Sequence, residues 1–562
     1  MKKIFLGLLF GLLTATSAFA AYMPQPNVYY ASAAGTTEAG LLAADATCAA
    51  KNYVCALDAS YTLTTDRTLS ATWQASGGVI TLAGHTLTLS KAFSASPTMQ
   101  MFSVASGGAL SAPLPPRIYG EWFGAKGDGT TNDSAALNAA LTFAGTGARG
   151  TVQLLPKVYV ANVTVPNGVT LTGSGDGPGY IGSVLSYQST IQANATGVIV
   201  DTATGSSRTI QSIHITNLNL RGLGSAVPLV GIKIEAGNDN FVIRNVFVTN
   251  TADQSIYTDT VSQAGVFENI LTNGALLNQT RASIAAACEI HGLDHVGRNL
   301  ECGNSQATFS TNYNLAVPLF TAGIWIDGTS DDNFTDMVGE ASDTGIYITG
   351  TSNTFRGLKP NFNFGHGLID NSSNSQYIGT RMLNNGRAAA STYDCFYKLA
   401  GSGVIDVEGL QCYTPGGDPA VRYAITDNVT YGALLGGNQS IYSHVMVSGS
   451  YSGQTYNFAD SFIGPRVSIP AGGWLILTQN STTPSVDNYQ SFRTNNTVST
   501  AISNFTNGVN GQIITVSVND ANTTIPNGST IHTIGGTTIS TQGTYMFEKY
   551  QTVWRQLSAG AS

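Results

Sequence analysis

The middle of the chain repeats a short alternation of hydrophobic and polar residues. In each repeat the second and fourth positions are mainly apolar, whereas the third and fifth carry larger or polar residues. Such alternation predicts a β-strand with one buried face. Six of these segments follow one another at intervals of 24, 32, 36, 22 and 22 residues, starting at Gly231, Ser255, Ala287, Gly323, Gly345 and Gly367.

A second short apolar segment follows about ten residues after the start of each of the first five. Asn245, Asn269 and Asn299 share one position in it, which predicts a stacked ladder of Asn side chains at a turn. Two or three strands in a repeat of about 22 residues are typical of a right-handed parallel β-helix, whose coils lie about 4.8 Å apart. A leucine-rich repeat would need a Leu/Asn consensus, and a sandwich would not keep two strand columns in register.

The two ends of the chain differ from this repeating middle. Residues 21–116 hold short alternating runs and predict a small β-rich module. After residue 465 the repeats stop, and residues 466–562 form short Thr- and Asn-rich runs with Asn-Gly turns. We therefore predict an all-β chain, with the β-helix over 117–465 between these two modules.

Residues 1–20 have the features of a bacterial export signal. Lys2 and Lys3 precede an apolar run over 4–13, and 18–20 form a small-x-small cleavage site before Ala21. The run is shorter than the roughly 18 residues that a membrane anchor needs, and no later segment is expected to span a membrane. We predict a secreted, periplasmic or cell-surface protein.

Composition excludes further classes of protein. The sequence has 25 Lys plus Arg and 33 Asp plus Glu, which gives a net charge of −8, and only 10% of its residues are charged. A hydrophobic content of 42% argues against intrinsic disorder. An acidic chain without Lys/Arg runs is not expected to bind nucleic acid.

The six cysteines lie as three close pairs along the chain: Cys48/Cys55, Cys288/Cys302 and Cys395/Cys412. Export implies an oxidising compartment, so disulfides are expected, although six cysteines allow fifteen pairings. The repeat places Cys288 at an inward position and Cys302 two residues after inward Leu300, with the third pair at equivalent points. Neighbour pairing would then bridge single coils, and buried free thiols are the alternative.

One stretch of the chain carries a family resemblance. Residues 121–141 (EWFGAKGDGTTNDSAALNAAL) resemble the opening of the pectate-lyase-superfamily β-helices, and 166–175 (PNGVTLTGSG) are similar to the first coil of that family. The family includes secreted polysaccharide-degrading enzymes and phage tailspikes, so the resemblance implies a polysaccharide partner. Residues 466–562 look like the β-sandwich domains behind tailspike β-helices, a likeness that fits a homotrimer or sugar binding.

The same stretch has a structural task. Asn132 or Asp133 can cap a helix from Ser134 to about Ala144. The apolar side of this helix is expected to cover the open end of the β-helix, whose edge would otherwise expose unpaired backbone groups.

Stacking the six repeats creates two columns that should face outward on one sheet. Trp325 and Tyr347 would lie in adjacent coils and offer a platform to a sugar ring. The third-position column is Lys233, Tyr257, Glu289, Trp325 and Tyr347, and the fifth-position column is Glu235, Asp259, His291, Asp327 and Thr349.

Glycoside hydrolysis needs two carboxyl groups, about 5 Å apart for retention and about 6.5–9.5 Å apart for inversion. Asp259 and Asp327, with His291 between them, fit the inverting spacing best, and Glu289 lies beside them. Crowding is expected to raise the pKa of at least one acid and make it a proton donor. Tyr257, Lys233 and Glu235 would complete the substrate-binding surface.

A second candidate pair is Asp343 and His366. Residues 342–345 (SDTG) and 365–367 (GHG) are similar to the Asp-Asp and Gly-His-Gly motifs of polygalacturonases, in which the first Asp donates the proton. Thr344 replaces the second Asp, Ala322 stands where the family has its other Asp, and the later Arg-x-Lys motif survives at best as Lys398. Turn residues are the alternative reading of Asp343 and His366.

These observations favour a secreted polysaccharide-degrading hydrolase that uses paired carboxylates. One alternative is a lyase of uronate polymers, with His291, Lys233 or Tyr257 as the base. Another is a tailspike-like carbohydrate binder or adhesin without catalysis. No metal or cofactor is expected, except for a cation such as calcium in the lyase alternative.

Overall fold

The structure is a computed structural model. It describes residues 27–104, 107–146, 150–175, 188–204, 212–224, 229–275, 285–304, 313, 315, 320–328, 331–400, 402–414, 421–428, 440–443, 445–449, 456–458, 475–486, 491–508 and 512–558. The predicted export signal over 1–20 lies outside these residues. The chain forms two compact units, Met1–Lys126 with Ala135–Val152, and Gly127–Ser134 with Gln153–Ser562. The domain boundaries set from the sequence remain predictions.

The first unit is built from short parallel strands as well as a helix. Each strand pairs in register with the strand one coil later, as Cys55 does with Trp73, so this module is itself a small parallel solenoid. Its three sheets are β1 (Val28–Tyr30), β2 (Val54–Leu57), β5 (Thr72–Ala75) and β8 (Phe93–Ser94); β3 (Tyr61–Thr62), β6 (Ile80–Thr81) and β9 (Phe102–Ser103); and β4 (Arg67–Leu69), β7 (Thr86–Leu89) and β10 (Ala109–Ser111).

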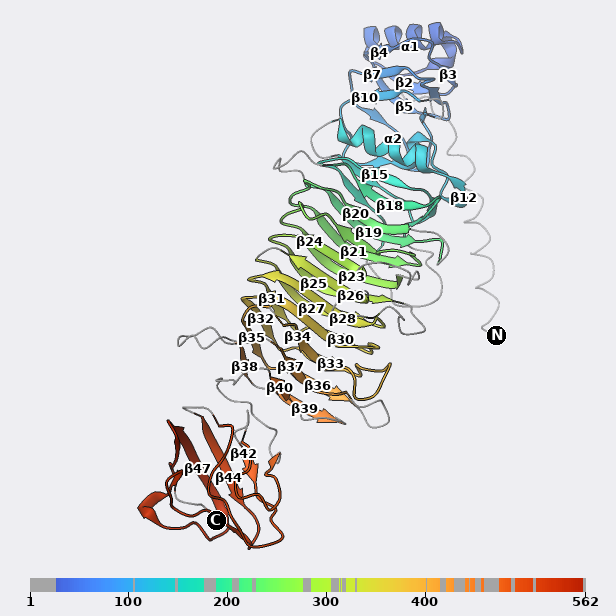
Figure 1. Cartoon of the computed structure of the whole chain (residues 1–562). Coiled ribbons are helices and arrows are strands. Elements are labelled where there is room, and N and C mark those ends of the chain that lie inside the picture. The colour runs from blue at the N-terminus through green and yellow to red at the C-terminus, as the bar shows by residue number, and fades with distance from the viewer. Residues whose placement is uncertain are drawn as a thin grey trace, which may run out of the picture. The chain divides into compact units, whose positions relative to one another are not determined.

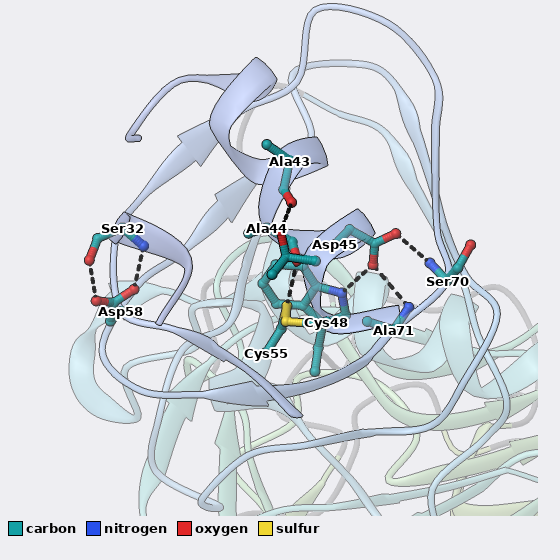
Figure 2. The surroundings of a disulfide bond; sticks show 11 residues. Ser32, Ala43, Ala44, Asp45, Cys48, Cys55, Asp58, Ser70 and Ala71 are labelled. Carbon is teal, nitrogen blue, oxygen red and sulfur yellow. Dashed lines mark hydrogen bonds between the residues drawn. A yellow bond between two sulfur atoms is a disulfide. The ribbon is translucent and has the colours of Figure 1, made fainter. Parts of the chain in front are cut away.

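Helix α1 (Glu38–Lys51) is attached to these strands by a buried carboxylate and a disulfide (Figure 2). Asp45 accepts hydrogen bonds from the backbone nitrogens of Ser70 (2.8 Å) and Ala71 (2.9 Å) and from the Trp73 indole (3.1 Å). Because Asp45 is buried, these donors replace the water that its charge would otherwise need. The Cys48–Cys55 disulfide joins the last turn of α1 to β2.

The predicted helix after residue 133 is present as α2 (Ser134–Gly145). The Asn132 side chain accepts a hydrogen bond from the Ser134 backbone nitrogen at 3.0 Å, which satisfies one donor at the start of the helix. Phe143 packs against Phe93 and Phe123, with ring centroids 6.0 and 5.9 Å apart. The role of helix α2 as a cover for the open end of the β-helix stays a prediction. Strands β11 (Ile118–Tyr119), β12 (Asp128–Asn132) and β13 (Thr151–Gln153) flank it in sequence.

The second unit contains the predicted parallel β-helix, whose coils stack one above another (Figure 1). The register matches the sequence alignment: Ile232 pairs with Ile256, Ile256 with Cys288, and so on along the column. Parallel crossovers of this kind are right-handed in nearly all proteins. Its first sheet contains β15 (Val163–Val165), β18 (Gly197–Thr202), β20 (Leu229–Ile234), β22 (Ile256–Thr258), β24 (Ala285–Gly292), β26 (Thr321–Gly328), β28 (Thr344–Thr351), β31 (Leu368–Ser373), β34 (Phe396–Lys398), β37 (Ile425–Asp427) and β40 (Tyr456–Phe458).

The second sheet of the β-helix is bent, and we call it the bent sheet. It contains long strands in the early coils and pairs of short strands in the later ones. From β14 onward its strands in chain order are β14 (Val158–Val160), β16 (Thr170–Thr172), β17 (Thr190–Gln192), β19 (His214–Arg221), β21 (Val242–Thr249), β23 (Val266–Ala275), β25 (Val296–Asn304), β27 (Asn333–Glu340), β29 (Thr354–Arg356), β30 (Lys359–Asn361), β32 (Ser375–Ile378), β33 (Arg381–Leu383), β35 (Ile405–Glu408), β36 (Gln411–Thr414), β38 (Ile441–Ser443) and β39 (Met446–Gly449).

The predicted Asn ladder lies at the bend. The side-chain nitrogens of Asn245, Asn269 and Asn299 each donate to the side-chain oxygen one coil earlier at 2.9 Å, starting from Asn217. All four residues have φ between 53° and 57°, a left-handed conformation that Asn tolerates better than most residues. Asp336 takes this place in the next coil, followed by Gly357, Gly379 and Gly409, all with positive φ.

All three predicted disulfides are present, which confirms the neighbour pairing. Cys288–Cys302 and Cys395–Cys412 each join the two sheets within one coil. Cys302 and Cys412 occupy the same column of the bent sheet. We expected Cys288 and Cys395 to occupy equivalent positions of the first sheet. Cys395 is displaced by one residue, because Phe396 lies in the column of Cys288.

A third region, residues 475–558, has its own sheets. Trp554 lies in its core and donates its indole N–H to the Phe505 carbonyl at 2.8 Å. The strands are β41 (Leu475–Ile476), β42 (Ser491–Arg493), β44 (Ile513–Val518), β47 (Gly543–Tyr550), β48 (Val553–Gln556) and β46 (Ile531–His532) in one mixed sheet, with β43 (Thr500–Ala501) and β45 (Thr523–Thr524) in another.

The interior of the late coils contains a stack of charges. Asp370, Lys398 and Asp427 occupy successive positions of one inward column. The Lys398 ammonium lies 2.8 Å from Asp370, and both side chains are fully buried. Tyr377 donates its hydroxyl to Asp370, and Tyr442 donates to Asp427 at 2.9 Å. Lys398 is therefore part of the core and does not serve an outward site.

We predict that Lys398→Met lowers the free energy of unfolding by about 3–5 kcal/mol, because it leaves the Asp370 carboxylate uncompensated in the core. Urea unfolding measures the change. The double variant Asp370→Leu/Lys398→Met should recover part of the loss. The half-exposed pair Lys359–Asp336 supplies the control, and Lys359→Met should cost no more than ~1 kcal/mol. Equal losses in the two single variants would contradict the prediction.

Candidate functional site

The outward columns predicted from the repeats are present on the first sheet of the β-helix. Glu289 pairs with Trp325, and Trp325 with Tyr347; His291 pairs with Asp327, and Asp327 with Thr349. Tyr257 pairs with Lys233 on one side and with Glu289 on the other. The strand register thus gathers residues that lie 22 to 36 positions apart in the sequence.

Glu289, His291 and Asp327 form a hydrogen-bonded network. The two ring nitrogens of His291 lie 2.9 Å from Glu289 Oε1 and 3.0 Å from Asp327 Oδ2. Gln254 donates to the other Glu289 oxygen at 2.7 Å, and Thr349 donates to the other Asp327 oxygen. The side chains of Glu289 and His291 are 9% and 7% exposed, whereas that of Asp327 is 38% exposed. Asp327 is therefore the member of the network that solvent reaches most.

The network holds a proton on His291. Burial lowers the pKa of His291, but the hydrogen bonds to Asp327 and Glu289 outweigh it and raise the pKa from 6.5 to about 9. The bond from His291 lowers the pKa of Asp327, against the opposing effect of its burial. We expected crowding to raise the pKa of an acid here. The pKa of Asp327 is lowered instead, because the protonated His291 lies between the two carboxylates.

The aromatic side chains around this network are unequally exposed. The Trp325 ring lies 5.0 Å from that of His291 and 6.0 Å from that of Tyr347, and Trp325 is half-buried. Tyr347 is 5% exposed and packs edge-on against Phe320 at 5.4 Å. The predicted Trp325/Tyr347 platform is therefore wrong for Tyr347, which is buried, whereas Trp325 is partly accessible. Phe320, with Tyr313 and Leu315, forms an apolar cluster over the third-position column.

Three predicted residues lie on the same face with their own partners. Lys233 forms an ion pair with Glu235, and this hydrogen bond raises the pKa of Lys233. Asp259 accepts from the backbone nitrogen of Val261 at 3.1 Å and so stabilises its own turn. We expected His291 to lie between Asp259 and Asp327. In the structure its two ring nitrogens hydrogen-bond to Glu289 and Asp327 instead.

The second candidate pair is buried away from this network. Asp343 is fully buried and accepts from the backbone nitrogen (2.9 Å) and hydroxyl (3.0 Å) of Thr321. His366 accepts from the Asp394 backbone nitrogen at 3.0 Å, and burial lowers its pKa to about 4. These contacts match the turn-residue alternative, and the burial keeps both side chains out of reach of a polysaccharide.

The sequence reasoning missed Gln254 in this site. Gln254 precedes its repeat by one residue and lies outside the strands, so no alternation pattern identifies it. Of the described residues, no group of three or more His, Cys, Asp and Glu side chains is arranged to hold a metal ion. Neither helix in the described ranges has the length and apolar character needed to cross a membrane. What the sequence indicates about cofactors, export and a homotrimer remains a prediction.

No family model matches this sequence, and no curated protein is similar to it in sequence. The solved structures that resemble the chain in fold include two proteins of phage and bacterial origin and a surface adhesin. The enzymatically active domain of bacteriophage CBA120 tailspike protein 2 has 14% identity and a TM-score of 0.40, covering 62% of this chain and 46% of that domain. The Azotobacter vinelandii mannuronan C-5 epimerase AlgE4 A-module has 15% identity and a TM-score of 0.36, covering 63% and 100%.

The Streptococcus pneumoniae surface adhesin PfbA has 12% identity and a TM-score of 0.41, covering 79% of this chain and 98% of PfbA. The matched region spans less than half of the tailspike domain. At these identities and scores, the likenesses carry no argument about the chemistry of this chain. The strand pairing itself defines the class, a parallel β-helix with a charged and aromatic outer face.

The raised pKa of His291 predicts a pH dependence of stability. Because the folded-state pKa (about 9) exceeds the ordinary value of 6.5, the stabilisation is complete below pH 6.5 and is lost as the pH rises through about 9. The free energy of unfolding should fall by up to ~3 kcal/mol over this window. Urea unfolding at several pH values measures it, and His291→Gln should flatten the slope. An unchanged slope in that variant would rule out His291 as the cause.

Proposed function

We propose that the chain binds a polysaccharide on the outward face of the first β-helix sheet and hydrolyses it there. The observation that carries this proposal is the Glu289–His291–Asp327 network beside half-buried Trp325. Glu289 and Asp327 bond to opposite ring nitrogens of His291, and of these two carboxylates Asp327 is the partly exposed one that a water molecule and a sugar can reach. Trp325 offers an apolar surface to a sugar ring.

Each residue has a distinct role in the proposed reaction. Asp327, ionised and partly exposed, takes a proton from the attacking water as the oxygen of that water bonds to the anomeric carbon. Water supplies the proton that the departing glycosidic oxygen needs, because His291, 3.0 Å from Asp327, lies on the same side of the anomeric carbon as the base. Protonated His291 keeps Asp327 ionised, and the proton that Asp327 has taken is then released to solvent. Glu289 holds the His291 ring in place.

The alternatives are weighted by the same geometry. A β-eliminating lyase needs an unprotonated base near neutral pH, and a His291 with a pKa of about 9 does not supply one. A non-catalytic carbohydrate binder is favoured by the burial of Glu289 and His291, whose hydrogen bonds are satisfied within the protein. In that case Trp325 and Asp327 contact sugar without chemistry.

Incubation with a panel of bacterial and plant polysaccharides tests the proposal. New reducing ends without an ultraviolet-absorbing unsaturated product indicate hydrolysis. The unsaturated product would indicate a lyase, and retention without cleavage a binder.

We predict that Asp327→Asn lowers the rate of cleavage by at least ~100-fold while glycan binding persists, because the amide cannot take the proton from water. Asp406→Asn changes a carboxylate on the bent sheet in the same way and should leave the rate unchanged. Full activity in Asp327→Asn would overturn the assignment of the site.

A further inference from the structure

The bent sheet carries a groove of about 710 Å³ that the proposed function does not use. It lies where the left-handed ladder residues bend the strands. The groove and the Glu289–His291–Asp327 network are on different sheets. The lining residues are Asn245, Asn269, Ile270, Leu271, Asn299, Leu300, Glu301, Asp336, Val338 and Lys359.

Amides and apolar side chains lie side by side in this groove. The Asn ladder repeats a carboxamide at each coil along one edge. Next to it runs an outward column in which Glu301 lies between Leu271 and Val338. A concave site with apolar patches and a few polar groups is the usual form of a ligand site.

Glu301 has a second carboxyl group near it. Glu340 pairs with Gly303, and the Cγ of Glu340 lies 3.2 Å from the place where a Cβ on Gly303 would be. The absence of a side chain at Gly303 therefore gives Glu340 room to lean over β25, the strand that carries Glu301. Burial raises the pKa of Glu301, and burial together with the charge of Glu301 raises that of Glu340. Among the described residues, no hydrogen bond stabilises either charge.

We propose that this groove binds an uncharged glycan chain whose hydroxyl groups hydrogen-bond to Glu301 and Glu340. The inference shares its class of ligand with the proposed function but rests on a different sheet. Leu271 and Val338 contact the apolar C–H surface of the sugar, and the ladder amides offer further donors and acceptors.

The negative charge of the groove determines which kind of glycan it favours. Among the described lining residues Glu301 and Asp336 are acidic, Glu340 leans toward Glu301, and the cation is Lys359, which lies 3.2 Å from Asp336. An acidic groove disfavours polymers of uronic acids, because like charges across an interface repel. The carboxyl groups of Glu301 and Glu340 can accept hydrogen bonds when ionised and donate one when protonated, which suits hydroxyl groups.

Binding of the labelled full chain to an array of uncharged, amino and uronic oligosaccharides tests the inference. We expect retention on at least one uncharged glycan and weaker retention on uronates. Glu301→Gln and Glu340→Gln keep the size of the side chain and should lower the affinity at least tenfold, since each removes a hydrogen bond to a charged group. Gly303→Ala should shift the Glu340 side chain by a few tenths of an ångström and lower the affinity less than either Gln variant does. Glu408→Gln, an exposed carboxylate elsewhere on the bent sheet, is the matched control.

The outcomes separate this groove from the proposed hydrolytic site. Cleavage that falls in Asp327→Asn, together with retention that is unchanged in Glu301→Gln and Glu340→Gln, overturns the groove and leaves the proposed function standing. Retention that falls in the two Gln variants supports the groove, whether or not cleavage is found. Retention on uronates that equals or exceeds that on uncharged glycans, or no retention on any glycan, overturns the inference.

Discussion

In-register hydrogen bonding between successive coils is the constraint on which the other features of the β-helix depend. It places each residue directly above the residue one coil earlier, so that His291 and Asp327, 36 residues apart, become neighbours. The same register aligns the inward rings of Phe334, Phe355 and Tyr377. A slip of one residue would exchange the inward and outward faces, which would turn Glu289 and Asp327 into the apolar interior and expose the apolar core.

The Asn ladder shows how side chains reinforce this register. Asn245 and Asn269 both donate and accept, so a chain of hydrogen bonds runs from Asn217 to Asn299 at a backbone conformation that few residues tolerate. At Gly357, Gly379 and Gly409, glycine keeps the left-handed backbone but has no side-chain amide to extend the ladder. In those later coils the long strand divides into two short ones, such as β29 and β30. The bend therefore persists in every coil, while the ladder that lines the groove belongs to the early ones.

The sequence predicted the column register well because inward positions are apolar and recur at fixed places in the repeats. It could not predict exposure, which depends on residues outside the repeat: Phe320 covers Tyr347, and the surroundings of Asp343 and His366 bury both. Asp370 and Lys398 are charged residues at inward positions, where the repeat otherwise has apolar side chains. They pair with each other, and Tyr377 donates a further hydrogen bond to Asp370. The first unit was missed as a solenoid because its strands, two to four residues long, are too short to show a period.

The two sets of carboxyl groups differ in what a ligand must do to reach them. On the first sheet, Asp327 and Glu289 already have donors, so a substrate must replace an existing hydrogen bond, and the partly exposed Asp327 offers the easier exchange. In the groove, burial destabilises the charges of Glu301 and Glu340, and a ligand that donates hydrogen bonds would relieve that cost. Preorganised, satisfied carboxylates suit proton transfer, whereas half-buried carboxyl groups to which no described residue donates suit binding.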